Sequence, residues 1–187
     1  MDLLRDIVSV CQTGNAPNIR RLKLIDVGRV VKVRYPLLYN NAAALNYQLG
    51  QTSVLMLPGS KLINIGFISG TGTYEEKMEE NEEGTGYINR VTISSKKDSP
   101  LNTLAVELML GRGFLGFIED RNGRCKVLGT VKQPLRLMNS ALTIGRNEKV
   151  LTWQCKMPFA SFFIPSIKNK DLLIGEFSDD FSDDFNI

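Results

Sequence analysis

The chain has 187 residues, of which 43% are hydrophobic and 23% charged, a composition typical of one soluble globular domain with its own core. Its formal net charge is +3, and it contains no histidine, which removes the usual general base at neutral pH, the usual zinc ligand and every imidazole-dependent catalytic triad. We therefore expect a protein that is not an enzyme and that binds neither a cofactor nor a metal.

The cysteines and the N-terminus indicate where the protein assembles. Cys11, Cys125 and Cys155 are odd in number and far apart, without a C-x-x-C spacing, so we expect three buried, reduced thiols and an intracellular assembly site. The N-terminal Met-Asp-Leu-Leu-Arg-Asp differs from a signal peptide, and no stretch approaches the ~20 apolar residues of a membrane helix. We expect no contact with a membrane.

Alternating or apolar segments predict a series of short strands in the first half of the chain. Turn residues such as Pro36 and Pro58-Gly59 end two of them. The segments cover residues 20–25, 29–35, 53–57, 63–68 and 87–95. Residues 1–12 fit either a short helix or a strand, and residues 40–47 are ambiguous.

One helix is predicted after these strands. Ser99 is a good N-cap, and Pro100 suits the first helical position. Apolar residues then recur at helical spacing, at Leu101, Leu104, Ala105 and Leu108. Gly111 or Gly113 can end the helix in a left-handed conformation.

A β-hairpin and closing strands follow the helix. Residues 114–120 and 125–129 read as strands joined by a turn at Asn122-Gly123, the strongest short hairpin signal. Further strands are predicted at residues 135–138, 150–157 and 160–164. The order predicts an α+β fold, mainly β: one antiparallel β-sandwich or barrel-like domain over residues 1–175, with one central helix.

A polar stretch between residues 70 and 86 is predicted to be a long glutamate-rich loop. Structureless connections longer than ~12–15 residues are usually functional or disordered, so we expect a loop of this length to have a function or to be disordered. We interpret it as an assembly loop, held by the basic body of another copy through Glu75, Glu76, Glu79, Glu80, Glu82 and Glu83.

The end of the chain repeats Phe-Ser-Asp-Asp. Residues 176–187 hold five acids and no base, so that without them the net charge of the body rises from +3 to +8. Phenylalanines spaced between carboxylates suit an arm that docks on an apolar, basic surface of a neighbouring copy or of its own domain. The residues of this assembly arm are Phe177, Asp179, Asp180, Phe181, Asp183, Asp184 and Phe185.

Two glycine-containing motifs resemble nucleotide-binding sequences, and both lack the required context. Residues 111–116 match G-x-G-x-x-G, but a dinucleotide site needs a strand before the motif and a helix after it, the reverse of the predicted order. Pro58-Gly59-Ser60-Lys61 lacks the earlier glycine of a phosphate loop. We interpret the first as a helix end and the second as a turn.

Charged residues leave two alternatives open. Paired acids in a cleft can hydrolyse glycosides, although the carboxylates here occur in runs that are normally solvated or paired, and residues 179–184 lack the spacing and glycine of a calcium loop. A basic sheet face can hold single-stranded nucleic acid. The bases available for it are Arg20, Arg21, Lys23, Arg29, Lys32, Arg34, Lys96, Lys97, Lys168 and Lys170.

About half of the chain, from Gly72 to Ile164, resembles a known family. In order it reads Gly-Thr-Tyr-Glu-Glu, an acidic stretch, Gly-Tyr-Ile-Asn-Arg-Val-Thr-Ile-Ser, a leucine-rich helix, Gly-Phe-Ile-Glu-Asp-Arg-Asn-Gly-Arg-Cys-Lys-Val-Leu-Gly-Thr and finally Leu-Thr-Trp-Gln-Cys-Lys-Met-Pro-Phe-Ala. This order is similar to bacteriophage and prophage tail structural proteins of the tail-tube type. The chain departs from that pattern at Gln133-Pro134-Leu135, at residues 146–149 and in its Phe-Ser-Asp-Asp ending.

The resemblance implies a structural subunit of a phage tail. Such subunits form rings, commonly of six, whose sheets join into one barrel around a lumen through which DNA passes, and the rings stack through a long loop and the chain termini. The implied partners are copies of itself and other virion tail proteins, and the implied location is the virion tail, after assembly in the bacterial host cytoplasm. A tube-cap, neck or baseplate protein of the same virion, or a nucleic-acid-binding module, is the alternative.

Overall fold

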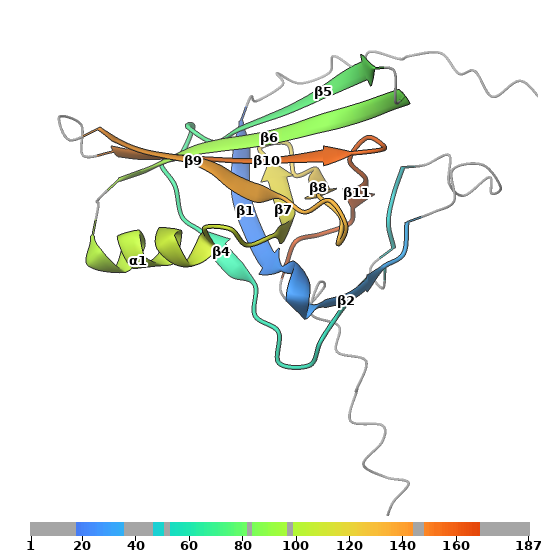
Figure 1. The fold of residues 1–187 in the computed structure, drawn as a ribbon, viewed down its shortest axis with the longest axis horizontal. Coiled ribbons are helices and arrows are strands. Elements are labelled where there is room, and N and C mark those ends of the chain that lie inside the picture. The colour runs from blue at the N-terminus through green and yellow to red at the C-terminus, as the bar shows by residue number, and fades with distance from the viewer. Residues whose placement is uncertain are drawn as a thin grey trace, which may run out of the picture.

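The computed structural model describes residues 18–35, 47–50, 53–81, 84–96, 99–143 and 148–168. In these residues a four-stranded and a five-stranded antiparallel sheet pack against each other, with one α-helix beside them (Figure 1). This arrangement confirms the predicted α+β, mainly β class. Glu82, Glu83, Cys11 and the predicted arm at residues 176–187 lie outside the described residues.

The first sheet has four strands in the order β5-β6-β10-β9, with every neighbouring pair antiparallel. Its members are β5 (Thr73–Asn81), β6 (Gly84–Lys96), β10 (Glu148–Met157) and β9 (Arg136–Thr143). In β6, Asn89, Val91 and Ile93 are fully buried, whereas Arg90, which points to the other face, is exposed. The two-residue alternation therefore gives this sheet one core face and one polar face.

The second sheet has five strands in the order β11-β8-β7-β1-β4. Its members are β11 (Phe163–Ile164), β8 (Cys125–Leu128), β7 (Phe114–Asp120), β1 (Ile19–Asp26) and β4 (Ile63–Ile65). The turn between β7 and β8 is the predicted one, because the Asp120 carboxylate accepts hydrogen bonds from the amides of Asn122 and Arg124, both at 2.8 Å, and Gly123 has a φ of 79°.

A short third layer covers the outer face of the five-stranded sheet. The chain leaves β1 through a 3₁₀ turn, η1 (Val27–Arg29), and enters β2 (Val30–Val33), which pairs with β3 (Val54–Met56). The Asp26 carboxylate caps this turn by accepting a hydrogen bond from the Gly28 amide at 2.8 Å. The five-stranded sheet is therefore covered on both faces.

Two hydrophobic cores result from this layering. The sandwich core, between the two sheets, is built around Trp153, Phe114 and Leu24. The outer core, between the five-stranded sheet and the β2–β3 layer, is built around Phe117, Phe162 and Ile25. Because β7 contributes large side chains to both cores, its sequence reads as a continuous apolar run rather than an alternating one.

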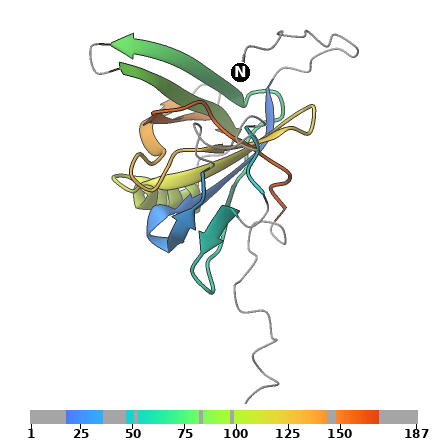
Figure 2. The same ribbon diagram turned by 90° about the vertical axis from the view of Figure 1, so that its right-hand side faces the viewer.

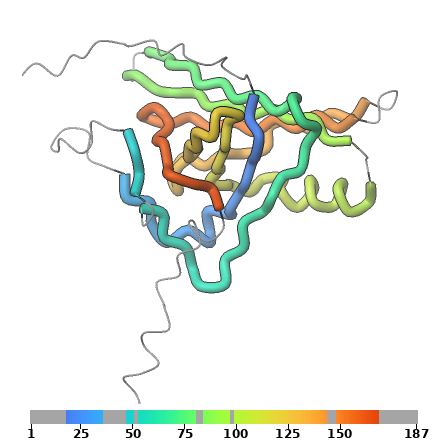
Figure 3. The backbone as a smooth tube through the Cα atoms, turned by 180° about the vertical axis from the view of Figure 1, so that it is seen from behind, coloured from blue at the N-terminus to red at the C-terminus, as the bar shows by residue number. Residues whose placement is uncertain are grey.

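The helix α1 (Pro100–Met109) begins and ends where the sequence predicts. The Ser99 side chain accepts a hydrogen bond from the Asn102 amide at 3.2 Å, and Gly111 has a left-handed φ of 71°. Its buried residues are Val106 and Met109, not the leucines that mark the predicted helical spacing. α1 lies at one end of the sandwich and the β2–β3 layer at the other (Figure 3).

The prediction of a long glutamate-rich loop is wrong. Residues 73–81 form β5, which pairs with β6 from Thr73 opposite Thr92 to Asn81 opposite Gly84. The stretch is therefore one arm of a β-hairpin, and Figure 2 shows the end of that hairpin standing clear of the other strands. The physical reason is that β6 is long enough to offer β5 a backbone partner at every position, which outweighs the low strand propensity of glutamate.

The G-x-G-x-x-G motif marks the end of α1 and the start of β7, as interpreted from the sequence, and two of its glycines also leave room for neighbouring side chains. A Cβ on Gly113 would lie 2.6 Å from a ring carbon of Pro134, and one on Gly116 would lie 2.8 Å from a methyl carbon of Leu135. The motif joins the end of α1 to β7, the reverse of the order in a dinucleotide site. Among the described residues, no helix is both long and apolar enough to cross a membrane.

Candidate assembly surfaces

A stripe of leucines on α1 faces solvent. Leu101, Leu104 and Leu108 are 78%, 55% and 54% exposed, respectively. Their spacing of three and four residues places them on one side of the helix, whereas the buried Val106 and Met109 lie on another side. We call these three residues the leucine stripe. An exposed apolar stripe on a helix is removed from water only when another surface packs against it.

The two edges of the four-stranded sheet have no neighbouring strand among the described residues. These edges are β5 and β9, and an open edge offers a row of backbone amides and carbonyls to another chain. β9 also carries two exposed apolar side chains, Met138 and Leu142. Leu142 pairs with Lys149, whose Nζ lies 3.2 Å from the Thr103 hydroxyl of α1, so the β9 edge and the helix belong to the same end of the molecule.

The four predicted assembly glutamates that the structure describes do not form one cluster. Glu75 and Glu79 are on the polar face of β5, where Glu75 lies 3.9 Å from Arg90 and Glu79 lies 3.5 Å from Lys77. Glu76 points to the opposite face, as the alternation along a strand requires. Glu80, also in β5, is exposed. Glu75, Glu79 and Glu80 therefore remain available for an assembly contact, and Glu76 does not.

Glu76 instead belongs to a partly buried polar cluster. Its Oε2 atom accepts hydrogen bonds from the Tyr74 hydroxyl at 2.7 Å and the Ser161 amide at 2.8 Å, and its Oε1 atom lies 3.6 Å from the Lys126 ammonium. The Ser161 hydroxyl donates to the Asn89 side-chain oxygen at 2.9 Å. We call these five residues the Glu76 cluster. It connects β5 with β6, β8 and the segment before β11.

The pKa values in this cluster follow from burial and hydrogen bonding. Burial alone would raise the pKa of Glu76, but the hydrogen bonds from Tyr74 and Ser161 and the charge of Lys126 outweigh it and lower the pKa. Burial raises the pKa of the Tyr74 hydroxyl. The cluster therefore holds an ionised Glu76 beside a neutral Tyr74. Because Asn89 and Ser161 are buried, the cluster acts as a structural tie for the hairpin.

Basic residues are partly neutralised within the domain. Arg20 and Arg21 lie 4.0 and 3.3 Å from the Glu119 carboxylate, and Arg112 lies 3.6 Å from Asp26. The two pairs with Glu119 reduce the positive charge that β1 offers to a nucleic acid. The basic residues at positions 97 and 170 lie outside the described residues.

Possible metal ligands and the cysteines are the remaining candidates for chemistry in the described part of the chain. In those residues, no group of three His, Cys, Asp or Glu side chains is placed to hold a metal ion. Cys125 and Cys155 are buried and free, as predicted. Burial raises the pKa of both thiols, that of Cys155 to about 12, so both are protonated at neutral pH.

The exposure of the leucines of α1 was not predicted from the sequence. A signal was present: six of the ten helix residues are apolar, more than one core-facing stripe needs. The Glu76 cluster could not be found in the same way, because its members are far apart in the chain.

No family model, no curated protein and no solved structure matches this chain.

Proposed function

We propose that this chain is a structural subunit of a bacteriophage tail, of the tail-tube type, which assembles with copies of itself into stacked rings that form a conduit for DNA. The observation that carries the proposal is the exposed leucine stripe of α1. An isolated copy leaves these side chains in water, whereas a ring covers them.

The energy available at the stripe is large enough to matter. Fully burying a leucine side chain contributes about 1.5–3 kcal/mol, so covering the exposed parts of Leu101, Leu104 and Leu108 contributes roughly 3–6 kcal/mol before the cost of association. Each contact in a closed ring is made once per copy, so the same gain recurs around the ring.

The open edges of the four-stranded sheet supply the second requirement of a ring. If β5 of one copy pairs with β9 of the next, the sheets join into one barrel, and no edge is left for unspecific pairing. The two edges are different strands, so the contact is head-to-tail, the type that closes into rings. The polar face of the sheet, which carries Arg90 and Gln154, stays in contact with water in this arrangement.

The order of the elements agrees with the family that the sequence resembles. β6, α1, the β7–β8 hairpin, β9 and β10 follow one another as the strand, helix, hairpin and closing strands of that pattern. This agreement supports a tail protein more than a nucleic-acid-binding module, since it involves the order of six elements rather than charge alone. The further partners would be other virion tail proteins, and the location would be the virion tail.

Electron microscopy with light scattering tests the proposal. The full-length protein is compared with a Leu104→Gln, Leu108→Gln variant and with a Leu57→Gln control, whose leucine is exposed outside α1. We expect rings or tubes for the wild-type and control proteins and monomers for the double variant. Wild-type protein that stays monomeric at high concentration under all conditions would contradict the proposal.

The same images address the position in the tail. Stacked rings that grow into tubes support a tube subunit. Single rings that never stack support the cap, neck or baseplate alternatives. If the protein is monomeric but binds DNA with an affinity that falls steeply as salt is raised, the nucleic-acid-binding hypothesis replaces the proposal.

A further inference from the structure

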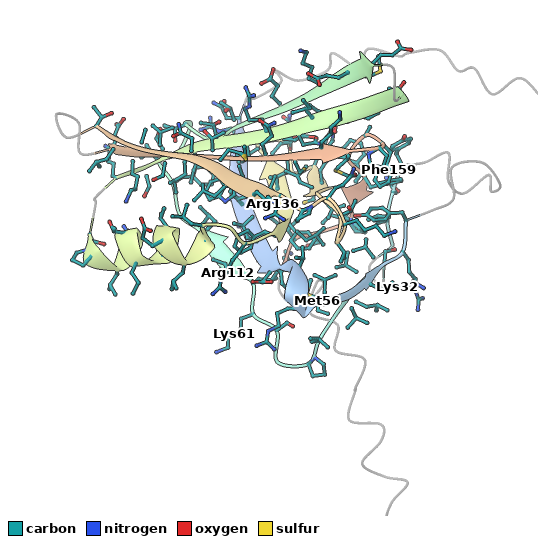
Figure 4. All side chains as sticks on the ribbon, in the orientation of Figure 1. Lys32, Met56, Lys61, Arg112, Arg136 and Phe159 are labelled. Atoms are coloured by element: carbon teal, nitrogen blue, oxygen red, sulfur yellow. The ribbon has the colours of Figure 1, made fainter. Side chains whose placement is uncertain are left out.

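A groove lies at the end of the molecule opposite α1. It is formed by β2, the loop after β8 and the turn between β10 and β11, and it has a volume of about 600 Å³. Lys32 and Phe159 mark it in Figure 4, on the opposite side of the molecule from the helix. Three segments far apart in the sequence thus form one surface, which we call the arm groove.

The lining of the arm groove is mainly apolar. Val31 and Val131 are 56% and 44% exposed, so both valines present apolar surface at the groove. Tyr35 and Phe159 supply aromatic rings whose centroids are 4.9 Å apart, and the Tyr35 hydroxyl donates to the Gly129 carbonyl at 3.0 Å. This hydrogen bond holds the Tyr35 ring in place, so the groove presents a fixed aromatic surface.

Behind these rings lies a larger aromatic cluster. Phe162 is fully buried, and its ring centroid lies 5.3 Å from that of Phe159 and 4.8 Å from that of Tyr47. An incoming aromatic side chain that packs on Tyr35 or Phe159 would join a network of tilted, edge-on and stacked rings. The groove is therefore suited to a phenylalanine-bearing segment.

The charges at the groove are positive. Lys32 and Lys132 are both exposed and line it, and no carboxylate is among the residues that line it. A ligand with aromatic anchors and carboxylates between them would satisfy both the apolar lining and the two ammonium groups.

The C-terminal arm of this chain has that composition. Residues 177–185 read Phe-Ser-Asp-Asp-Phe-Ser-Asp-Asp-Phe, with three phenylalanines and four aspartates. We propose that the arm groove of one copy binds the Phe-Ser-Asp-Asp arm of a neighbouring copy, with a phenylalanine on the aromatic lining and aspartates beside Lys32 and Lys132.

The neighbour is the expected source of the arm because of where the groove lies. A ring requires each copy to use two different surfaces. The helix α1, which carries the leucine stripe, and β2, which lines the arm groove, lie on opposite sides of the molecule (Figure 3). An arm that crosses between copies adds apolar contact and charge pairing to the same assembly. This inference rests on the proposed self-assembly, and it names the contact that the arm makes.

A mixing experiment with full-length chains tests both the site and the source. In a Cys11→Ser background, one chain carries Gln133→Cys at the groove and a second carries Ser182→Cys in the arm. A short bismaleimide then joins thiols that lie close together. Neither change removes a lysine, phenylalanine or aspartate named above, and Cys125 and Cys155 are buried. The control replaces Gln133→Cys with Lys61→Cys, an exposed position outside the groove.

We expect a cross-linked pair from the mixture and none from the Lys61→Cys control. If a single chain carrying both cysteines is linked only within itself, and the mixture gives no pair, the arm docks on its own domain and the assignment to a neighbour is overturned. If neither arrangement gives a link, another segment occupies the groove, and the inference as a whole is overturned.

Charge reversal provides a second readout on the same chains. Lys32→Glu with Lys132→Glu is expected to lower the yield of the cross-linked pair about tenfold, and an arm with all four aspartates changed to lysine should restore it. Lys61→Glu is the matched control and should change nothing. An unaffected yield in the double variant would contradict the role of the two lysines.

Light scattering on the same samples separates this inference from the proposed function. Chains that assemble into rings but give no link at the groove leave the function standing and overturn the arm contact. Chains that link at the groove but never form rings support the contact and contradict the ring.

Discussion

The two sheets of the sandwich differ in how completely they are covered. In the five-stranded sheet the central strand β7 is buried on both faces, because it directs Phe114 into the sandwich core and Phe117 into the outer core. The four-stranded sheet has one buried face, and its other face carries polar cross-strand pairs such as Arg90 with Gln154, at 3.2 Å.

This difference separates the part of the molecule that determines the fold from the part available for association. The central strands β7 and β8 of the five-stranded sheet have their apolar side chains buried within one copy. The four-stranded sheet and its helix leave two sheet edges and the leucine stripe unsatisfied in the described residues. Substitutions in the first region should therefore change stability, and substitutions in the second should change assembly.

The largest effect on stability is expected at Phe117. Its side chain is fully buried in the outer core, and replacing it with alanine removes a large apolar group from a closely packed site. Phe117→Ala should lower the free energy of unfolding by about 3–5 kcal/mol, measured by chemical denaturation. Ile88→Ala, on the polar face of the four-stranded sheet, is the control and should cost less than about 1 kcal/mol. Similar losses for both variants would remove the contrast between the sheets.

A smaller loss is expected at Gly129, which follows β8. Its φ is 82°, and a Cβ there would lie 2.9 Å from the Leu135 amide nitrogen and 3.3 Å from the Phe114 carbonyl oxygen. Gly129→Ala should cost about 2–3 kcal/mol, because conformational strain and a backbone clash add. Gly123 has a similar φ of 79° with no atom within 4 Å of such a Cβ, so Gly123→Ala isolates the strain, about 1 kcal/mol. Equal losses in thermal unfolding would exclude the clash.

Local signals explain which elements could be predicted from the sequence. The N-cap at Ser99, the turn at Asn122-Gly123 and the apolar run of β7 each depend on residues that are neighbours in the chain. Their physics acts over a few residues, so the sequence specifies them directly.

Non-local packing explains what could not be predicted. β5 is a strand because β6 pairs with it, although its own composition indicates a loop. Which side of α1 is buried depends on Val106 and Met109 joining the sandwich core, and the leucine spacing alone indicates the wrong side. The arm groove combines β2 with residues about 100 positions later. In each case the deciding partner is distant in the sequence.

The Glu76 cluster gives the hairpin a dependence on pH. The pKa of Glu76 is lower in the folded protein than its ordinary value of 4.5. Such a carboxyl group stabilises the fold at pH values above its unfolded pKa. This contribution is lost as the pH falls through the folded pKa. Wild-type protein should therefore lose more stability than Glu76→Gln as the pH falls from about 6 to about 3, measured by urea unfolding. Glu75→Gln, on the polar face, should follow the wild type. A Glu76→Gln curve parallel to that of the wild type would show that the cluster does not tie the hairpin.

The smallest effect on the fold, and the largest on assembly, is expected at the leucine stripe. Glutamine has nearly the same helix propensity as leucine, and the replaced side chains are more than half exposed, so Leu104→Gln with Leu108→Gln should change the stability of the monomer by less than about 0.5 kcal/mol. Wild-type protein should unfold at a temperature that rises with protein concentration, because assembly stabilises the folded state by mass action. The double variant should lose this concentration dependence and keep the unfolding temperature of dilute wild-type protein. A variant that unfolds earlier at every concentration would show instead that the stripe belongs to the fold, and the distinction between the two regions would not hold.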